Sequence, residues 1–265
     1  MNRFAHYPSL EGRTVFISGG TTGIGTAFVE HFHAQGAKVG FIGRNREAAD
    51  ALLAGIAAGP NPHGAPTPLF IPCDVTDVAA LQAAIAQTRS AFGLVGALVN
   101  NAANDQRHRV EEVTPEFWDQ CMNVNLRHQF FAAQAVVDDM VGLGGGSIIN
   151  LGSISWMIKG AGYPAYATTK AAIHGLTRSL AKDLGKRNIR VNALVPGAIA
   201  AGGFVADPAL SRHIPLGRLG NADDLAPLAL AVLSNRISGY VTGASIVIDG
   251  GLALTNWFDP PQLDD

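Results

Sequence analysis

Short apolar segments alternate along the chain with longer amphipathic segments. The apolar segments are rich in valine, isoleucine and phenylalanine, which is typical of strands that are buried on both faces of a parallel sheet. They cover residues 14–18, 38–42, 69–73, 94–99, 147–151, 189–195 and 245–249. The amphipathic segments show the spacing of apolar residues that a helix needs. They cover residues 26–35, 45–57, 77–91, 115–141, 164–184 and 222–234.

This alternation predicts an α/β fold, in which residues 1–265 form a single Rossmann-type domain. The expected architecture is a doubly wound, seven-stranded parallel sheet with helices on both faces. The proline- and glycine-rich stretch 57–68 is interpreted as a surface loop, because the alternation resumes directly after it. The pattern lapses again over about residues 197–220. We predict a substrate loop there, since long irregular segments of compact domains are usually functional.

A glycine-rich segment joins the first predicted strand to the first predicted helix and reads G-G-T-T-G-I-G. A strand, a glycine loop and a helix in this order place backbone N–H groups and a helix N-terminus against a pyrophosphate. The sequence therefore predicts a dinucleotide-binding site. Its expected contacts are Gly19, Thr21, Thr22, Gly23, Ile24 and Gly25.

The end of the second predicted strand bears on the choice of cofactor. In dinucleotide-binding folds an acidic residue at this point accepts from the 2′-hydroxyl of NAD, whereas arginine accommodates the 2′-phosphate of NADP. Here Gly43 stands in the place of the acid, and Arg44 follows it. The sequence favours NADP(H), and NAD(H) is also possible because neither Thr21 nor Thr22 is basic. The alternative is that Arg44 is a solvated arginine at the start of a helix.

Three side chains that could exchange a proton with a substrate lie close together in the sequence. Ser153 follows the fifth predicted strand, and Tyr166 and Lys170 lie four residues apart, on one face of a helix. An ammonium beside a phenol favours the phenolate, whose ordinary pKa is about 10, and so makes a general base. Asn125 lies inside a predicted helix, where a buried amide needs either a structural partner or a solvent chain.

These segments, in this order, resemble the short-chain dehydrogenase/reductase family. The matching segments are S-G-G-T-T-G-I-G at 18–25, D-V at 74–75, N-N-A-A at 100–103, N-V-N at 123–125, Ser153, Y-A-T-T-K at 166–170 and P-G-A-I at 196–199. The resemblance implies a Rossmann fold and an oxidoreductase that transfers hydride to or from NAD(P). It also implies further cofactor contacts, at Asp74, Val75, Asn101, Ala102, Ala103, Pro196, Gly197 and Ile199.

The same resemblance implies a role for each catalytic candidate. Tyr166 would remove or donate the hydroxyl proton. Lys170 would lower the pKa of Tyr166 and bind the ribose of the nicotinamide. Ser153 would hydrogen-bond the reacting oxygen, and Asn125 would hold a water that links Lys170 to solvent.

Four further segments resemble the bacterial aldose 1-dehydrogenases of this family, the D-xylose 1-dehydrogenase kind. They read Y-P-S-L-E-G at 7–12, N-D-Q-R-H at 104–108, N-V-N-L-R-H at 123–128 and G-S-I-S-W at 152–156. Those enzymes oxidise the anomeric carbon of a sugar to the lactone, so the resemblance implies a monosaccharide substrate. The expected substrate contacts are Asn104, Ser153, Ser155, Trp156, Tyr163 and Tyr166. Trp156 has the alternative of filling the core.

Two other functions stay open at this point. An NADPH-dependent ketoreductase, acting on a 3-oxoacyl thioester or another small carbonyl compound, would suit Arg44 and the stretch 200–215, which is short for an enzyme of the xylose type. A non-catalytic nucleotide-binding protein would have no need of Tyr166 and Lys170.

Composition and charge limit the kinds of ligand and the cellular location that the sequence allows. The formal charge of −2 gives no sign of nucleic-acid binding, and no apolar run approaches the roughly 18 residues of a membrane span. Cys73 and Cys121 lack the spacing of a metal site, which favours reduced thiols in a cytoplasmic protein and predicts no metal. The family resemblance implies a homotetramer that pairs through the helices at 115–141 and 164–184 and through the last helix and strand.

Overall fold

The structure, a computed structural model, describes residues 5–158, 161–201 and 208–254. Seven parallel strands form one sheet in the order β3-β2-β1-β4-β5-β6-β7. The strands are β1 (Thr14–Ser18), β2 (Lys38–Gly43), β3 (Leu69–Pro72), β4 (Val95–Asn100), β5 (Gly146–Leu151), β6 (Ile189–Pro196) and β7 (Ser245–Ile248). The predicted α/β fold with a seven-stranded parallel sheet is confirmed. Because the strand order reverses between β1 and β4, a ligand crevice is expected at their carboxyl ends.

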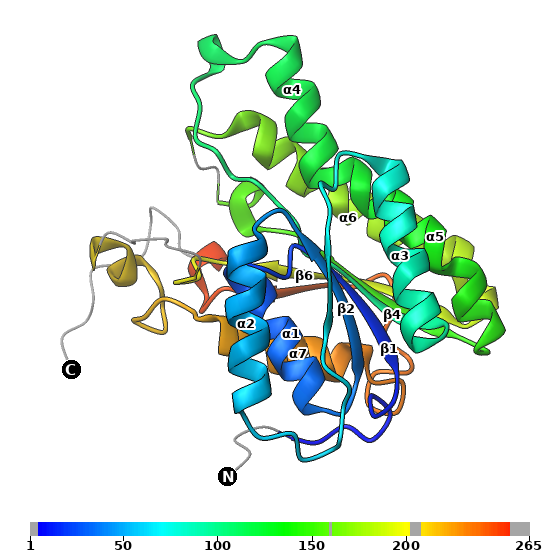
Figure 1. Cartoon of the computed structure of the whole chain (residues 1–265). Helices are drawn as coiled ribbons and strands as arrows, with labels where there is room; N and C mark the ends of the chain where they lie inside the picture. The colour runs from blue at the N-terminus through cyan, green and yellow to red at the C-terminus, as the bar shows by residue number, and fades with distance from the viewer. Residues whose placement is uncertain (1–4, 159–160, 202–207, 255–265) are drawn as a thin grey trace.

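Helices cover both faces of the sheet (Figure 1). They are α1 (Ile24–Ala34), α2 (Arg46–Ala58), α3 (Val78–Phe92), α4 (Pro115–Met122), α5 (His128–Gly142), α6 (Pro164–Leu184) and α7 (Ala222–Leu233). The buried residues of α1, α2 and α7 share one hydrophobic core, and those of α3, α5 and α6 share the core on the opposite face. The central strands are buried between these two layers, which explains their continuous apolar sequences.

Polar caps fix where several helices begin. The side chains of Asn45, Asp77, Thr114 and Asn221 each accept a hydrogen bond from a backbone N–H in the first turn that follows. Such caps satisfy donors that have no partner inside the helix. They place the helix starts within a residue or two of the positions that the sequence predicted.

The predicted helix over residues 115–141 is wrong in one respect, because its middle is not an α-helix. Residues Asn123–Arg127 form a π-helical turn between α4 and α5. A π turn holds one residue more than an α turn, and such turns often occur at functional sites. Asn125, one of the predicted catalytic residues, lies in this turn and is fully buried.

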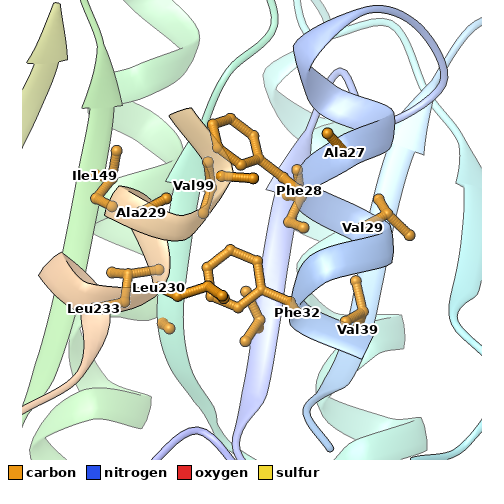
Figure 2. Packing of buried hydrophobic residues seen from close by; sticks show 14 of the residues in the cluster. Ala27, Phe28, Val29, Phe32, Val39, Val99, Ile149, Ala229, Leu230 and Leu233 are labelled. Carbon is orange, nitrogen blue, oxygen red and sulfur yellow. The ribbon is translucent and has the colours of Figure 1, made fainter. Parts of the chain in front are cut away.

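The core between α1 and α7 depends on two phenylalanines. Figure 2 shows Phe28 and Phe32 of α1 pointing toward α7, where Leu230 and Leu233 lie. All four side chains are fully buried. Burial of aromatic side chains of this size is a major stabilising contribution to a domain.

We predict that Phe32→Ala lowers the free energy of unfolding by about 3–5 kcal/mol, because it removes a buried ring and leaves a cavity. Equilibrium unfolding in urea measures the loss. The matched control is Ile237→Ala, because the Ile237 side chain is 65% exposed and its truncation should change the free energy by less than about 0.5 kcal/mol. Equal losses in the two variants would contradict the prediction.

The segment after β6 is only partly regular. Ile199 and Gly220 form an isolated parallel bridge, and a 3-10 helix covers Pro208–His213. Residues 202–207, which belong to the predicted substrate loop, lie outside the described residues. Across the described ranges, no helix combines the length and the apolar character that crossing a bilayer requires.

Candidate active site

A cavity of about 870 Å³ opens at the carboxyl ends of the strands. Its walls come from the segments that follow β1 to β6. These segments contribute residues 19, 21–24, 43–45, 73–75, 101–105, 151–155 and 196–199. The volume lies in the range of ligand-binding pockets. The position agrees with the crevice expected from the reversal of strand order.

The loop after β1 packs closely against the start of α1 and the end of β2, because glycine stands at the contact point in each of them, at Gly25 and Gly43. A Cβ atom at Gly25 would overlap the carbonyl oxygen of Gly19. A Cβ atom at Gly43 would meet the side chain of Thr21, so β2 cannot carry an acidic side chain there while Thr21 keeps its place. Gly25 was predicted to contact the cofactor, but it is not part of the described cavity wall, because it packs against the backbone of Gly19. The other predicted contacts of this loop line the cavity: Gly19, Thr21, Thr22, Gly23 and Ile24.

The start of α1 has the features of an anion site. Gly23 precedes the helix, supplies no side-chain cap and is followed by no acidic residue in the first turn. Gly23 and Ile24 line the cavity, so α1 begins at the cavity without a capping side chain among the described residues. A helix N-terminus of this kind can hold a pyrophosphate through its N–H groups and its dipole.

A buried hydroxyl joins the ends of β1 and β4. Oγ of Ser18 accepts hydrogen bonds from the N–H groups of Asn101 and Ala102, at 3.0 and 3.1 Å. It also lies 3.5 Å from Nε2 of His128. Burial, and then the charge of Lys170, lower the pKa of His128 to about 3, so its imidazole is neutral. Sequence reasoning gave Ser18 and His128 no role, although both lie in segments that carry the family resemblance.

Ser153, Tyr166 and Lys170 come together on one side of the cavity. Ser153 and Tyr166 both line the cavity, where the Ser153 hydroxyl acts to lower the pKa of the Tyr166 phenol. Nζ of Lys170 lies 5.5 Å from the centre of the Tyr166 ring and donates to the carbonyl oxygen of Leu151 at 2.8 Å. β5 delivers Ser153, and α6 places Tyr166 and Lys170 one turn apart. The three residues all line the cavity, as the spacing led us to expect.

Burial perturbs both ionisable groups of this trio. It raises the pKa of Tyr166 above its ordinary value, while the hydroxyl of Ser153 acts in the opposite direction. Burial also lowers the pKa of Lys170 to about 8, against the charges of Asp105 and Cys121. The sequence predicted that the pKa of Tyr166 would be lowered, but in the protein without a bound cofactor it is raised. The reason is desolvation, which disfavours a phenolate and which residue spacing does not reveal.

The side chain of Asn125 has protein partners on both of its polar atoms. Its Oδ1 accepts from the N–H of Asn104 at 2.9 Å, and its Nδ2 donates to the carbonyl oxygens of Asn104 and Cys121, each at 3.0 Å. Of the two alternatives from the sequence, a structural partner and a solvent chain, the side chain takes the first. Its backbone carbonyl accepts from Gln129 at 3.2 Å and retains a second lone pair.

Polar residues form the wall opposite the glycine loop. Asn104, Ser155 and Tyr163 line the cavity, as predicted. The hydroxyl of Ser155 is buried and has no hydrogen-bond partner among the described residues. Asp105 and Arg107 line the same wall. Sequence reasoning did not single out these two, although they belong to the N-D-Q-R-H segment that it used.

The prediction that Trp156 lines the substrate site is not met. Its side chain is 38% exposed, its ring lies 6.1 Å from that of His174, and the residue is not part of the described cavity wall. It is the last residue of the short 3-10 helix Ile154–Trp156, whose other two residues are buried and line the cavity. The alternative of a core residue is also not met, because of this exposure.

The other predicted cofactor contacts lie along the cavity. They are Arg44, Asp74, Val75, Asn101, Ala102, Ala103, Pro196, Gly197 and Ile199. Arg44 is 76% exposed, and its Nη1 lies 3.9 Å from Oδ2 of Asp74. The two side chains stand where the end of β2 meets the end of β3, which in such folds is the adenosine side of the site.

One group of potential metal ligands lies away from the cavity. Ligand atoms of His6, Glu11 and His63 fall within 4.8 Å of one another. The two imidazole rings are stacked, with centroids 4.1 Å apart and planes 4° apart. Lone pairs in parallel ring planes do not converge on one point, so this arrangement is not a coordination site as it stands.

Comparison with known proteins gives consistent matches. A family model described as enoyl-(acyl carrier protein) reductase matches residues 19–253. The probable galactose dehydrogenase GalD of Rhizobium meliloti (strain 1021) is 42% identical over 94% of this chain and 98% of that protein. The D-xylose 1-dehydrogenase of Caulobacter vibrioides (strain NA1000 / CB15N) is 44% identical over 74% of this chain and 75% of that protein.

A solved structure shares both the fold and part of the sequence. The short-chain dehydrogenase/reductase from Serratia marcescens BCRC 10948 superposes with a TM-score of 0.84. It is 34% identical, over 92% of this chain and 99% of that one.

Proposed function

Because the chain belongs to the short-chain dehydrogenase/reductase family, we propose that it oxidises an aldose at the anomeric carbon and produces the lactone. The hydride passes to NADP or NAD, which supplies the redox chemistry when bound. The phenolate of Tyr166 takes the proton of the anomeric hydroxyl. Ser153 donates a hydrogen bond to the reacting oxygen, and Lys170 stabilises the phenolate electrostatically.

One observation carries the choice of a sugar. The wall beside Ser153 combines the unpaired, buried hydroxyl of Ser155 with the carboxylate of Asp105 and the guanidinium of Arg107. Several polar groups on one wall suit a ligand with hydroxyls along its length. The two relatives described above are both named as sugar dehydrogenases, which favours a sugar over the ketoreductase alternative.

A panel of D-galactose, D-xylose and other pentoses and hexoses, each with NADP and with NAD, tests this function. We expect turnover of at least one aldose, and formation of the lactone as the first product. Reduction of a β-ketoester with NADPH, in the absence of turnover of any sugar, would favour the ketoreductase instead.

We also propose that NADP is preferred over NAD, through Arg44. The glycine at position 43 leaves no acidic side chain at the end of β2 itself, and the guanidinium of Arg44 lies at the adenosine end of the cavity. Oδ2 of Asp74 lies 3.9 Å from Nη1 of Arg44, so this carboxylate competes with a 2′-phosphate for the guanidinium. This competition supports NAD as a second cofactor.

Arg44→Asp is therefore expected to weaken NADP binding by about 1.5–3 kcal/mol, the usual loss for charge-assisted hydrogen bonds. NAD binding should change little. Titration of each cofactor by fluorescence measures both affinities. Arg109→Asp provides the matched control, since Arg109 is 76% exposed, is not part of the cavity wall and undergoes the same change of charge. An unchanged ratio of NADP to NAD affinity would show that Arg44 is only a surface charge.

Four further proposals concern the domain organisation, a bound water at Asn125, the oligomeric state and the cellular location. We propose one domain with a substrate loop at about 197–220, and a water held by the backbone carbonyl of Asn125. Pairing into a homotetramer would use α4, α5 and α6 together with α7 and β7; the exposure of Trp118 (38%) and Phe130 (41%) supports the part on α4 and α5, and light scattering tests it. Cys73 and Cys121 are free thiols, which agrees with a cytoplasmic enzyme.

A further inference from the structure

The imidazole of His108 lies between the loop at 101–109 and the start of α6. Its Nδ1 is 2.9 Å from the carbonyl oxygen of Gln106, and its Nε2 is 3.1 Å from the backbone nitrogen of Ala165. A carbonyl oxygen can only accept, and a backbone N–H can only donate. The proton of a neutral imidazole must therefore lie on Nδ1, and Nε2 must be the acceptor. His108 is 7% exposed, and its ring packs on Phe117, with centroids 4.7 Å apart.

The first turn of α6 has no cap of its own. Tyr163 occupies the N-cap position and makes no side-chain cap hydrogen bond. Pro164, at the first helical position, has no N–H group. Ala165 is the next donor of this turn, and it donates to His108, which lies 57 residues earlier in the chain. His108 thus provides, from a distant loop, the hydrogen-bond acceptor that a Ser, Thr, Asp or Asn side chain at the N-cap position usually provides.

Two more contacts join the same pair of segments. The N–H of His108 donates to the carbonyl oxygen of Gly162 at 2.9 Å. The guanidinium of Arg107 lies over the ring of Tyr163, 4.2 Å from its centroid. The loop is itself fixed on its other side, where Asn125 binds both backbone groups of Asn104. The loop is therefore held between the π turn and the first turn of α6.

Tyr166 follows Ala165 directly. We propose that His108 is a positioning residue, which caps the catalytic helix through Ala165 and so sets where the phenol of Tyr166 lies relative to Ser153 and to the substrate wall. Without this acceptor, the N–H of Ala165 is a buried donor with no partner. Such a donor is costly enough for the first turn to shift in search of one. Tyr166 moves with that turn, whereas the cofactor loop after β1 does not.

Two variants of His108 test this. His108→Phe keeps an aromatic ring against Phe117 but removes the acceptor for Ala165. His108→Gln is the conservative variant, because its amide oxygen reaches about as far as Nε2 and can accept the same hydrogen bond. For His108→Phe we expect kcat to fall by about tenfold to 100-fold, since a misplacement of about 1 Å has effects of this order. The dissociation constant of NADP should stay within about twofold, and His108→Gln should recover most of the activity.

Hydrogen exchange gives a readout that does not depend on turnover. In His108→Phe the amides of the first turn of α6 should exchange at least about tenfold faster than in the wild type, and in His108→Gln they should stay protected. The control is His63→Phe, which makes the same replacement in the connector between α2 and β3, away from the cavity, and should change neither kcat nor this exchange. Kinetic measurements use D-galactose and D-xylose with NADP.

The outcomes separate this inference from the proposed function on which it rests. Normal kcat and normal exchange in His108→Phe would overturn the role of His108, even if Tyr166 is shown to be essential. Equal losses in His108→Phe and His108→Gln would also overturn it, because the second variant retains an acceptor. If the wild type oxidises neither sugar, the proposed function is in doubt, and the exchange data alone decide whether His108 caps α6.

Discussion

Replacing Tyr166 with phenylalanine is expected to lower kcat/KM for sugar oxidation by about 10²- to 10⁴-fold, the range that a positioned general base contributes. The change removes one oxygen and leaves the ring in place, so NADP binding should be retained. Because burial raises the pKa of Tyr166 in the chain alone, the rate of the wild-type enzyme should increase with pH as the phenolate forms. In Tyr166→Phe this increase should disappear.

The measurement is steady-state kinetics with D-xylose and D-galactose over a range of pH, together with NADP titration. Tyr163→Phe is the matched control. Its ring lies nearly perpendicular to that of Tyr166, with centroids 6.2 Å apart, and it lines the same cavity, but it is not the proposed base. We expect its kcat/KM to fall less than about tenfold. A Tyr166→Phe enzyme that retained a tenth of the wild-type activity would contradict the proposed base.

The second large effect is expected at Lys170, where activity and stability should change in opposite directions. Lys170→Met removes the buried ammonium beside Tyr166, and we expect kcat/KM to fall by about 10²- to 10³-fold, as on removal of one preorganised electrostatic group. The onset of the remaining activity should shift to higher pH, because the phenolate has lost the ammonium that lies 5.5 Å from its ring centre.

The stability change follows from burial of the same group. The pKa of Lys170 is lowered from 10.5 to about 8 in the folded chain, so between these two values the unfolded chain binds more protons than the folded chain. Stability due to this group therefore rises with pH across that window, and below it the folded chain carries the full cost of a buried ammonium. We expect Lys170→Met to be more stable than the wild type at pH 7 and to lack the rise between pH 8 and 10.5.

Urea unfolding at several pH values measures this difference. Lys182→Met, at an exposed position of the same helix, is the control and should change neither the activity nor the pH dependence of stability. A Lys170→Met variant that was less stable than the wild type at every pH would show that the hydrogen bond to Leu151 outweighs the cost of burying the charge.

The sequence predicted the sheet and the helix boundaries well because these depend on local chemistry. Buried parallel strands need continuous apolar runs, and helices start at side chains that cap them, such as Asn45 and Asp77. The grouping of Ser153, Tyr166 and Lys170 was also predictable, since parallel strands end at one edge of the sheet and residues four apart share a helix face.

Features that depend on contacts between distant residues were not predictable. The π turn at Asn123–Arg127 breaks no pattern of apolar residues, so the spacing suggested one continuous helix. The hydrogen bond from Ala165 to His108 joins residues that no local motif connects. The raised pKa of Tyr166 reflects burial, which depends on everything packed around the ring. The 38% exposure of Trp156 and its absence from the cavity wall also depend on how the short 3-10 helix Ile154–Trp156 folds.

The neutral imidazole of His128 determines which groups an experimenter will see in a pH profile. Its pKa of about 3 means that the network from His128 through Ser18 to Asn101 and Ala102 keeps one protonation state throughout the neutral range. A change of rate near neutral or alkaline pH therefore reports on the proton-transfer groups and not on the shape of the cofactor loop. Below pH 6.5, where the unfolded histidine gains a proton and the folded one does not, stability falls, so acid should act on this enzyme by unfolding it.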